Sequence, residues 1–139
     1  MNNSKLFKYT LYLSIIGIFL AIYLLFEQLT NSPLKPCNIN ATINCNTIIS
    51  GAVSKTLGIP TPLYGLFGYI FIFLSGIYKK KKTLLGIATF GLLFCLWIAY
   101  QELFLLHVIC PICIACQIIM LCIFIIGIVI NKNPDKTTR

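Results

Sequence analysis

Four long apolar runs constrain this chain more than any other feature of its sequence. They predict helices at about residues 9–29, 57–78, 83–106 and 111–130. An apolar helix of about 20 residues, rising about 1.5 Å per residue, crosses the hydrocarbon core of a bilayer. The chain is 58% hydrophobic and only 10% charged, whereas a soluble domain carries about 25% charged residues. The sequence therefore predicts an all-α protein, a single integral-membrane domain that spans residues 1–139 as a four-helix bundle.

The first apolar run resembles a signal peptide in one respect, because Lys5 and Lys8 precede it. However, it is longer than the apolar region of a signal peptide, and the segment that follows it, EQLTNSPLK, offers no small-residue cleavage site. We therefore expect this run to be retained as the first membrane helix.

The basic residues are grouped in a way that predicts the orientation of the chain in the membrane. Lys and Arg are concentrated in cytoplasmic loops, and nine of the eleven lie within residues 5–8, 79–82 and 132–139. Both termini and the middle connection are therefore predicted to be cytoplasmic, in a multi-pass protein of the plasma membrane. The connection at residues 30–56 and the one before the last helix then face outward. Because the basic clusters alternate with apolar runs, the net charge of +8 does not indicate nucleic-acid binding.

The sequence contains seven cysteines: Cys37, Cys45, Cys95, Cys110, Cys113, Cys116 and Cys122. Two of them fall in the connection at residues 30–56, and the pair at residues 110–113 falls at the outer end of the last helix. These four are predicted to share the oxidising face of the membrane, where disulfides persist. The other three lie inside apolar runs and are expected to behave as small buried hydrophobic residues.

The segment CPIC at residues 110–113 has the arrangement of a redox-active pair at the start of a helix. Proline is well tolerated at the first helical position, which puts Cys110 near the N-cap and Cys113 in the first turn. The positive end of the helix dipole stabilises a thiolate there, and a stabilised thiolate is the reactive form of cysteine. The alternative is a structural or accidental cysteine pair.

The spacing of Cys110, Cys113, Cys116 and Cys122 also has the form of a metal or iron–sulfur motif. On a helix, however, the first three would step around the axis, and the fourth would lie about two turns away. A metal cluster needs thiolates that converge on one point, so no metal site is predicted.

Cys37 and Cys45 enclose the asparagine-rich segment NINATIN, which predicts a loop. The pair is either a static structural disulfide or a mobile one that exchanges with Cys110, because thiol–disulfide exchange passes electrons between pairs that touch. The rest of this outer loop, residues 46–56, is either a short interfacial helix that caps the bundle or an irregular segment.

Three motifs in this order resemble the vitamin K epoxide reductase (VKOR) family, in its small prokaryotic form without a fused thioredoxin domain. They are the loop pair at residues 37–45, TLGIPTPLYGLFGY at residues 56–69 and ELFLLHVICPIC at residues 102–113. The disulfide-bond formation protein B, another four-helix quinone enzyme, carries its C-x-x-C first and its wider pair second. The resemblance covers nearly the whole chain and implies a membrane thiol:quinone oxidoreductase.

The resemblance implies a role for each of the four outer cysteines. Cys37 would take electrons from a separate thioredoxin-fold protein of the DsbA type, and Cys45 would attack the Cys110–Cys113 disulfide. Cys110 would exchange with the loop, and Cys113 would react with a quinone of the menaquinone or ubiquinone type. The net result would be disulfide formation in exported proteins. The alternative is a non-enzymatic membrane accessory protein whose outer disulfides are structural.

The sequence offers few other residues for a quinone site. Many family members carry two serines after the second loop cysteine, but here Ser50 is followed by Gly51, so Ser50 or Ser54 would have to serve. His107 and Glu102 are candidate proton donors to the quinone, or polar residues that simply face water at a helix end. Aromatic residues of the second and third helices either line the quinone site or pack in the bundle: Tyr64, Phe67, Tyr69, Trp97 and Tyr100.

Overall fold

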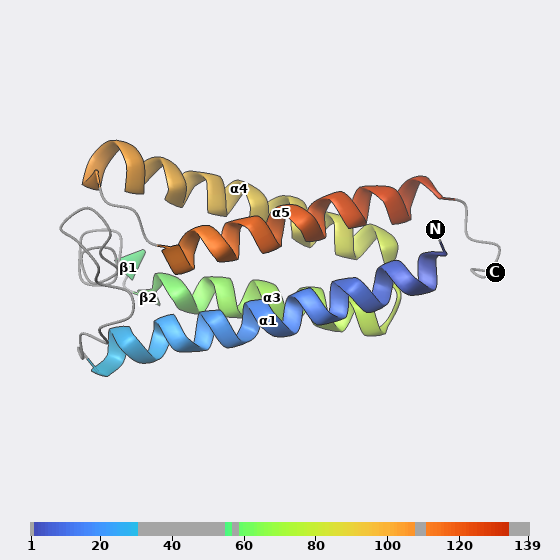
Figure 1. Ribbon diagram of the computed structural model, residues 1–139, viewed down its shortest axis with the longest axis horizontal. Helices are drawn as coiled ribbons and strands as arrows, with labels where there is room; N and C mark the ends of the chain where they lie inside the picture. The colour runs from blue at the N-terminus through green and yellow to red at the C-terminus, as the bar shows by residue number, and fades with distance from the viewer. Residues whose placement is uncertain (1, 31–54, 57–58, 108–110, 134–139) are drawn as a thin grey trace.

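Four helices make up almost all of the chain that the structure describes (Figure 1). A computed structural model describes residues 2–30, 55–56, 59–107 and 111–133. In chain order the helices are α1 (Asn3–Thr30), α3 (Thr61–Ile77), α4 (Lys81–Tyr100) and α5 (Pro111–Lys132). α4 continues without a break into a π-helical segment, η2 (Gln101–Leu106). The predicted all-α bundle is confirmed.

Two very short strands precede α3. β1 (Lys55–Thr56) and β2 (Ile59–Pro60) pair in antiparallel fashion. Helix α3 therefore begins at Thr61, later than the apolar run in the sequence suggests. Pro62 lies in its first turn, where the missing N–H of a proline costs nothing. The outer-loop segment at residues 46–54, expected to be an interfacial helix or an irregular segment, lies outside the described residues.

The helices run up and down, so that each is antiparallel to the next (Figure 1). α1 packs against α3 and α5, and α4 packs against α5 and, more sparsely, against α3. The start of α1, the turn between α3 and α4 and the end of α5 lie at one end of the bundle. The end of α1, the two strands, η2 and the start of α5 lie at the other end. We call the second of these the cysteine end, because Cys113 lies there.

Three helical stretches are long and apolar enough to cross a bilayer, namely Asn3–Phe26, Lys81–Phe104 and Pro111–Lys132. α3 is also apolar but shorter, with 17 residues. Large apolar side chains cover the outer surface of the bundle: Phe19 is 69% exposed and Phe90 is 74% exposed. The outer surface of a soluble bundle is polar. The chain is therefore a membrane protein whose apolar surface is suited to lipid contact.

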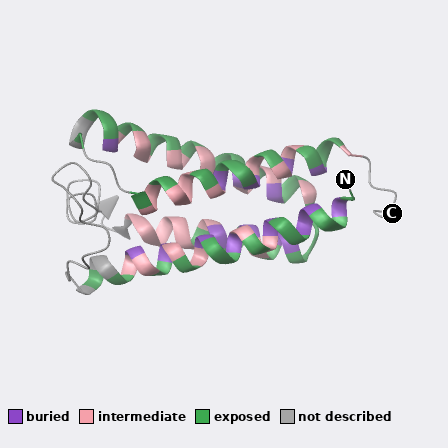
Figure 2. Cartoon of the chain, viewed as in Figure 1, coloured by how far each residue is buried: buried purple, intermediate pink, exposed green. Residues whose placement is uncertain are grey.

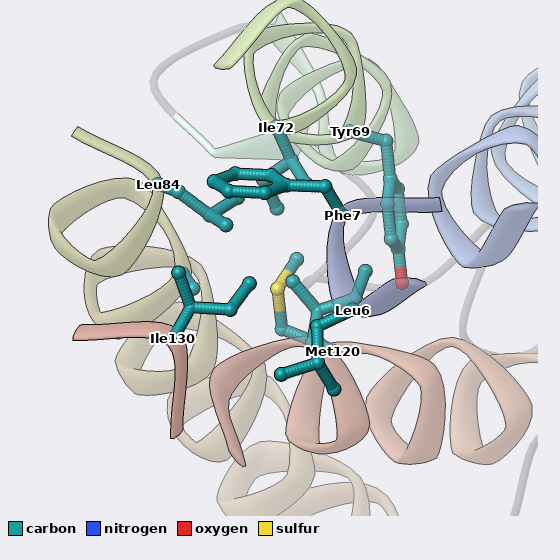
Figure 3. Packing of buried hydrophobic residues seen from close by; sticks show 9 residues of the cluster. Leu6, Phe7, Tyr69, Ile72, Leu84, Met120 and Ile130 are labelled. Atoms are coloured by element: carbon teal, nitrogen blue, oxygen red, sulfur yellow. The ribbon is translucent and has the colours of Figure 1, made fainter. Parts of the chain in front are cut away.

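The hydrophobic core gathers side chains from all four helices. Phe7 of α1 reaches toward Ile72 of α3 and Leu84 of α4, beside Ile130 of α5 (Figure 3). These residues come from the start of α1, the end of α3, the start of α4 and the end of α5. The tightest packing therefore lies away from the cysteine end. Toward the cysteine end the facing side chains are mostly half-buried (Figure 2).

Tyr69 ties three helices together in the middle of the bundle. Its hydroxyl donates a hydrogen bond to the carbonyl oxygen of Cys116 in α5, at 2.7 Å. Its ring packs on Gly17 of α1 so closely that a Cβ atom at Gly17 would overlap the ring. Tyr69 itself is only 2% exposed. Tyr69 therefore fixes the distance between α1, α3 and the part of α5 that carries Cys116.

We expect Tyr69→Phe to lower the free energy of unfolding by about 0.6–1 kcal/mol, the usual worth of one hydrogen bond between membrane helices. Gly17→Ala should cost more, about 1–3 kcal/mol, because the added methyl group displaces the ring. Both values are obtained from denaturant unfolding of the purified protein in detergent micelles. Equal stability of Gly17→Ala and the wild type would contradict the close packing of this ring.

Candidate functional site

Cys113 lies in the first turn of α5, which begins at Pro111. The amide groups of a first helical turn have no partners within the helix, and the helix dipole is positive there. Cys113 is half-buried, so its thiol is partly shielded from water. Reactive cysteines are often found at helix N-termini of this kind. Cys37, Cys45, Ser50 and Cys110 lie outside the described residues, so their positions and roles stay predictions from the sequence.

Glu102 lies beside Cys113, across the junction between η2 and α5. Its side chain is only 3% exposed. The thiol of Cys113 donates a hydrogen bond to the carboxylate of Glu102. The other carboxylate oxygen, Oε1, is buried and has no hydrogen-bond partner among the residues that the structure describes. The arrangement therefore brings together a nucleophilic thiol and an acidic group inside an apolar bundle.

Glu102 lies at the start of the π-helical segment η2, and His107 follows its end. The backbone N–H of His107 donates to the carbonyl oxygen of Glu102, five residues back, which is the hydrogen bond of a π-helix. His107 ends the segment with a left-handed backbone, φ 53° and ψ 31°. Its side chain is exposed, whereas that of Glu102 is buried. Of the two candidate proton carriers, only Glu102 lies inside the bundle next to Cys113.

A cavity of about 660 Å³ opens between the helices and reaches Cys113. Along α5 it extends from Cys113 to Met120, and its lining is almost entirely apolar. It is lined by side chains from all four helices, and among them are Leu24, Tyr64, Phe67, Tyr69, Phe90, Phe94, Cys95 and Cys116. The loosely packed half of the bundle thus leaves a partly open apolar cavity beside the candidate nucleophile.

Glycines keep this cavity open. Gly65 and Gly68 of α3 and Gly86 of α4 all line it. A Cβ atom at any of these three positions would meet no neighbouring atom within 4 Å. Larger residues at these positions would fill part of the space, so the three glycines contribute to the volume of the cavity.

The structure separates the aromatic candidates of the sequence into two groups. Tyr64, Phe67 and Tyr69 line the cavity. Trp97 packs on Phe94, with ring centroids 5.9 Å apart, and Tyr100 stacks on Phe104 at 4.9 Å; both are exposed on the outer surface. Of these five candidates, the three on α3 are therefore the ones available to a ligand, and Phe90 and Phe94 of α4 also line the cavity.

The three deeper cysteines occupy different surroundings. Cys95 and Cys116 line the cavity, whereas Cys122 is exposed on α5. Within the described part of the chain, no group of three or more His, Cys, Asp or Glu side chains is arranged to hold a metal ion.

The site can be compared with known protein families. Residues 8–128 match the profile of the vitamin K epoxide reductase family, and no curated protein matches the chain. The family comprises oxidoreductases that in general use quinones. The match extends from α1 through most of α5 and includes every residue of the cavity. The chain belongs to the vitamin K epoxide reductase family.

Proposed function

We propose that this protein is a membrane thiol:quinone oxidoreductase that drives disulfide formation in exported proteins. The observation that carries the proposal is the position of Cys113, at the N-terminus of α5 and in the wall of an apolar cavity. A thiolate is stabilised at such a helix end. The cavity volume of about 660 Å³ lies within the range of small-molecule sites, roughly 300–1,000 Å³.

The cavity suits a quinone in chemistry as well as in volume. A quinone has a flat, apolar ring, and the walls offer aromatic side chains and the open space beside Gly65, Gly68 and Gly86. Aromatic rings stack favourably on flat ring systems. When bound, the quinone supplies the two-electron oxidising power. The thiol of Cys113 and the rings of Tyr64 and Tyr69 border the space that it would occupy.

Electrons enter, in this proposal, from a reduced thioredoxin-fold protein of the DsbA type. Its two thiols reduce the Cys37–Cys45 disulfide, and these in turn reduce Cys110–Cys113. Each exchange breaks one disulfide and forms another, so two electrons and two protons move at every step. The Cys110–Cys113 dithiol finally returns to the disulfide and gives two electrons and two protons to the quinone. Tethering all four cysteines in one chain makes the internal exchange unimolecular, which speeds it.

We further propose four passes through the plasma membrane, with both termini in the cytoplasm. Lys79–Lys82 lie in or beside the α3–α4 turn, at the same end of the bundle as the start of α1 and the end of α5 (Figure 1). The Nζ atom of Lys81 donates to the carbonyl oxygen of Asn133, at 3.4 Å. Basic residues favour the cytoplasmic side. The cysteine end would then face the oxidising side, where exported proteins acquire disulfides.

The proposal is tested with the purified protein in liposomes, menaquinone or ubiquinone, and a reduced thioredoxin-fold protein. Absorbance of the oxidised quinone should fall only when all three components are present. The oxidised form of the thioredoxin-fold protein should accumulate in equal amount. A protein that stays folded but reduces neither quinone would overturn the proposal and favour the accessory-protein alternative.

Gly68→Leu should raise the KM for the quinone by about tenfold or more, because the leucine side chain fills part of the cavity. Gly68→Ala adds only one methyl group where no atom lies within 4 Å, so its KM should stay within about twofold of the wild type. Both constants come from the same absorbance assay at varied quinone concentration. Equal KM values for the leucine and alanine variants would place the quinone elsewhere.

A further inference from the structure

The turn between α3 and α4 consists largely of lysine. Residues 79–82 are four consecutive lysines, which we call the lysine turn. Together with Tyr78 and Thr83 they line an open hollow of about 450 Å³. Lys81 is half-buried, and the other three lysines are exposed. The end of the bundle opposite the cysteine end therefore carries a compact, accessible patch of positive charge.

The lysine turn lies where the helices reach the surface of the bilayer (Figure 1). The apolar helix α3 ends at Ile77, and the membrane-spanning stretch of α4 begins at Lys81. Leu74, Ile77 and Tyr78 are exposed on the outer surface of α3 and at its end, and tyrosine is typical of the membrane–water interface. A lipid molecule at this place would have its headgroup beside the lysines and its acyl chains along the apolar surface of the bundle.

No acidic residue in the described part of the chain lies near the lysine turn. The acidic residues described are Glu27, at the end of α1, and Glu102, in η2, and both of these elements lie at the cysteine end (Figure 1); Asp135 lies outside the described residues. The first turn of α4 contains no acidic residue. Lys81 donates to the carbonyl oxygen of Asn133, which holds its ammonium group against the end of α5. The positive charge of the patch is therefore suited to an external anion.

The backbone of the turn would suit glycine better than lysine at one position. The N–H of Lys79 donates to the carbonyl oxygen of Gly76, and the N–H of Lys80 donates to that of Ser75. These two bonds form a Schellman motif, in which the residue after the helix is left-handed and usually glycine. Lys79 occupies that place with φ 53°, which is unfavourable for a residue with a Cβ atom. Backbone strain of this kind points to a role for the side chain beyond the turn itself.

We propose that the lysine turn binds the headgroup of an anionic phospholipid. The ammonium groups of Lys79, Lys80 and Lys82 donate to the phosphate, and the acyl chains lie against α3 and α4. Basic clusters beside membrane helices attract anionic lipids, and each lysine near the surface contributes about fivefold to the affinity. In the orientation proposed above, the lipid comes from the cytoplasmic leaflet. This binding goes beyond the redox function, because no cysteine and no quinone takes part in it.

The test is native mass spectrometry of the purified full-length protein in detergent, at physiological ionic strength. The protein is titrated with dioleoylphosphatidylglycerol or with dioleoylphosphatidylcholine, which share their acyl chains and phosphate but differ in net charge. The wild type should bind phosphatidylglycerol at least about tenfold more tightly. The triple variant Lys79→Gln/Lys80→Gln/Lys82→Gln should bind it about 100-fold more weakly than the wild type and show no preference. Equal affinity of the wild type for the two lipids would overturn the proposal.

The matched control removes the same number of charges elsewhere at the same end of the bundle. Lys5 and Lys8 of α1 and Lys132 of α5 are exposed there. The variant Lys5→Gln/Lys8→Gln/Lys132→Gln should keep its affinity for phosphatidylglycerol within about threefold of the wild type, because exposed charges away from the headgroup are screened by salt. An equal loss of affinity in the two triple variants would show that net charge, rather than the lysine turn, attracts the lipid.

Lys79→Gly separates lipid binding from folding. Glycine accepts the left-handed backbone of this position, so the midpoint of unfolding in lipid-free detergent should not fall. The affinity for phosphatidylglycerol should still fall by about fivefold, because one ammonium group is lost. Wild-type affinity, or a loss of stability that accompanies the loss of binding, would contradict the assignment of Lys79 to the lipid.

Discussion

Replacing Cys113 with alanine is expected to lower quinone reduction by about 10³-fold or more, with every electron donor. Among the described residues of the cavity wall, Cys113 is the one that lies at a helix N-terminus and also interacts with an acidic side chain. Removal of a nucleophile from a site of this kind usually costs several orders of magnitude, because the remaining groups only bind and orient. The loss should appear in kcat, measured as the fall in quinone absorbance with either the thioredoxin-fold protein or dithiothreitol as reductant.

The matched control is Cys122→Ala, which removes an exposed cysteine from the same helix. Its turnover should stay within about twofold of the wild type, since a surface substitution away from the site has little effect. Retention of quinone reduction by a folded Cys113→Ala protein would exclude Cys113 as the residue that reacts with the quinone. Cys95 and Cys116, which also line the cavity, would then be the next candidates.

Cys45→Ala is expected to remove turnover driven by the thioredoxin-fold protein, again by about 10³-fold, but to spare turnover driven by dithiothreitol. Without Cys45 the loop cannot form the Cys37–Cys45 disulfide, so it can neither accept two electrons from the protein donor nor pass them on to the Cys110–Cys113 disulfide. A small dithiol reduces Cys110–Cys113 directly, since exchange requires only access to the disulfide. The ratio of the two rates, measured in one preparation, separates transfer through the loop from chemistry at the cavity.

Thr42→Ala, in the same loop segment, is the control for this experiment and should support both donors equally well. If Cys45→Ala keeps its activity with the protein donor, the loop pair is a structural disulfide and electrons reach Cys110 directly. If it loses activity with both donors, Cys45 supports the fold or the quinone site rather than the relay.

Much of the architecture could be predicted from the pattern of apolar residues. A helix satisfies its backbone hydrogen bonds internally, so a run of about 20 apolar residues in a membrane is almost always a helix. The described helices follow those runs, and Pro111 marks the start of α5 in the sequence itself. The start of α3 is less predictable, because an apolar residue such as Ile59 suits a strand as well as a helix.

The site was less predictable, and Glu102 and His107 show why. In the sequence they are two polar residues near the end of one apolar run, and either could be the proton donor. An acidic residue near the end of an apolar run indicates function. The sequence does not, however, predict that η2 forms π-helical hydrogen bonds. With this local change of helical geometry, the side chain of Glu102 is buried beside Cys113 and that of His107 is exposed.

The sequence by itself determined that this chain forms apolar helices and that Cys113 lies just after a proline at the start of one of them. These are local properties, set by composition, spacing and the missing N–H of Pro111. Only the tertiary structure decided that Cys113 meets both a buried carboxylate and a cavity of about 660 Å³. Both features depend on how residues from different helices pack, with glycine on α3 and α4 leaving space that their neighbours do not fill. Such contacts between distant segments are not encoded in the periodicity of any single run.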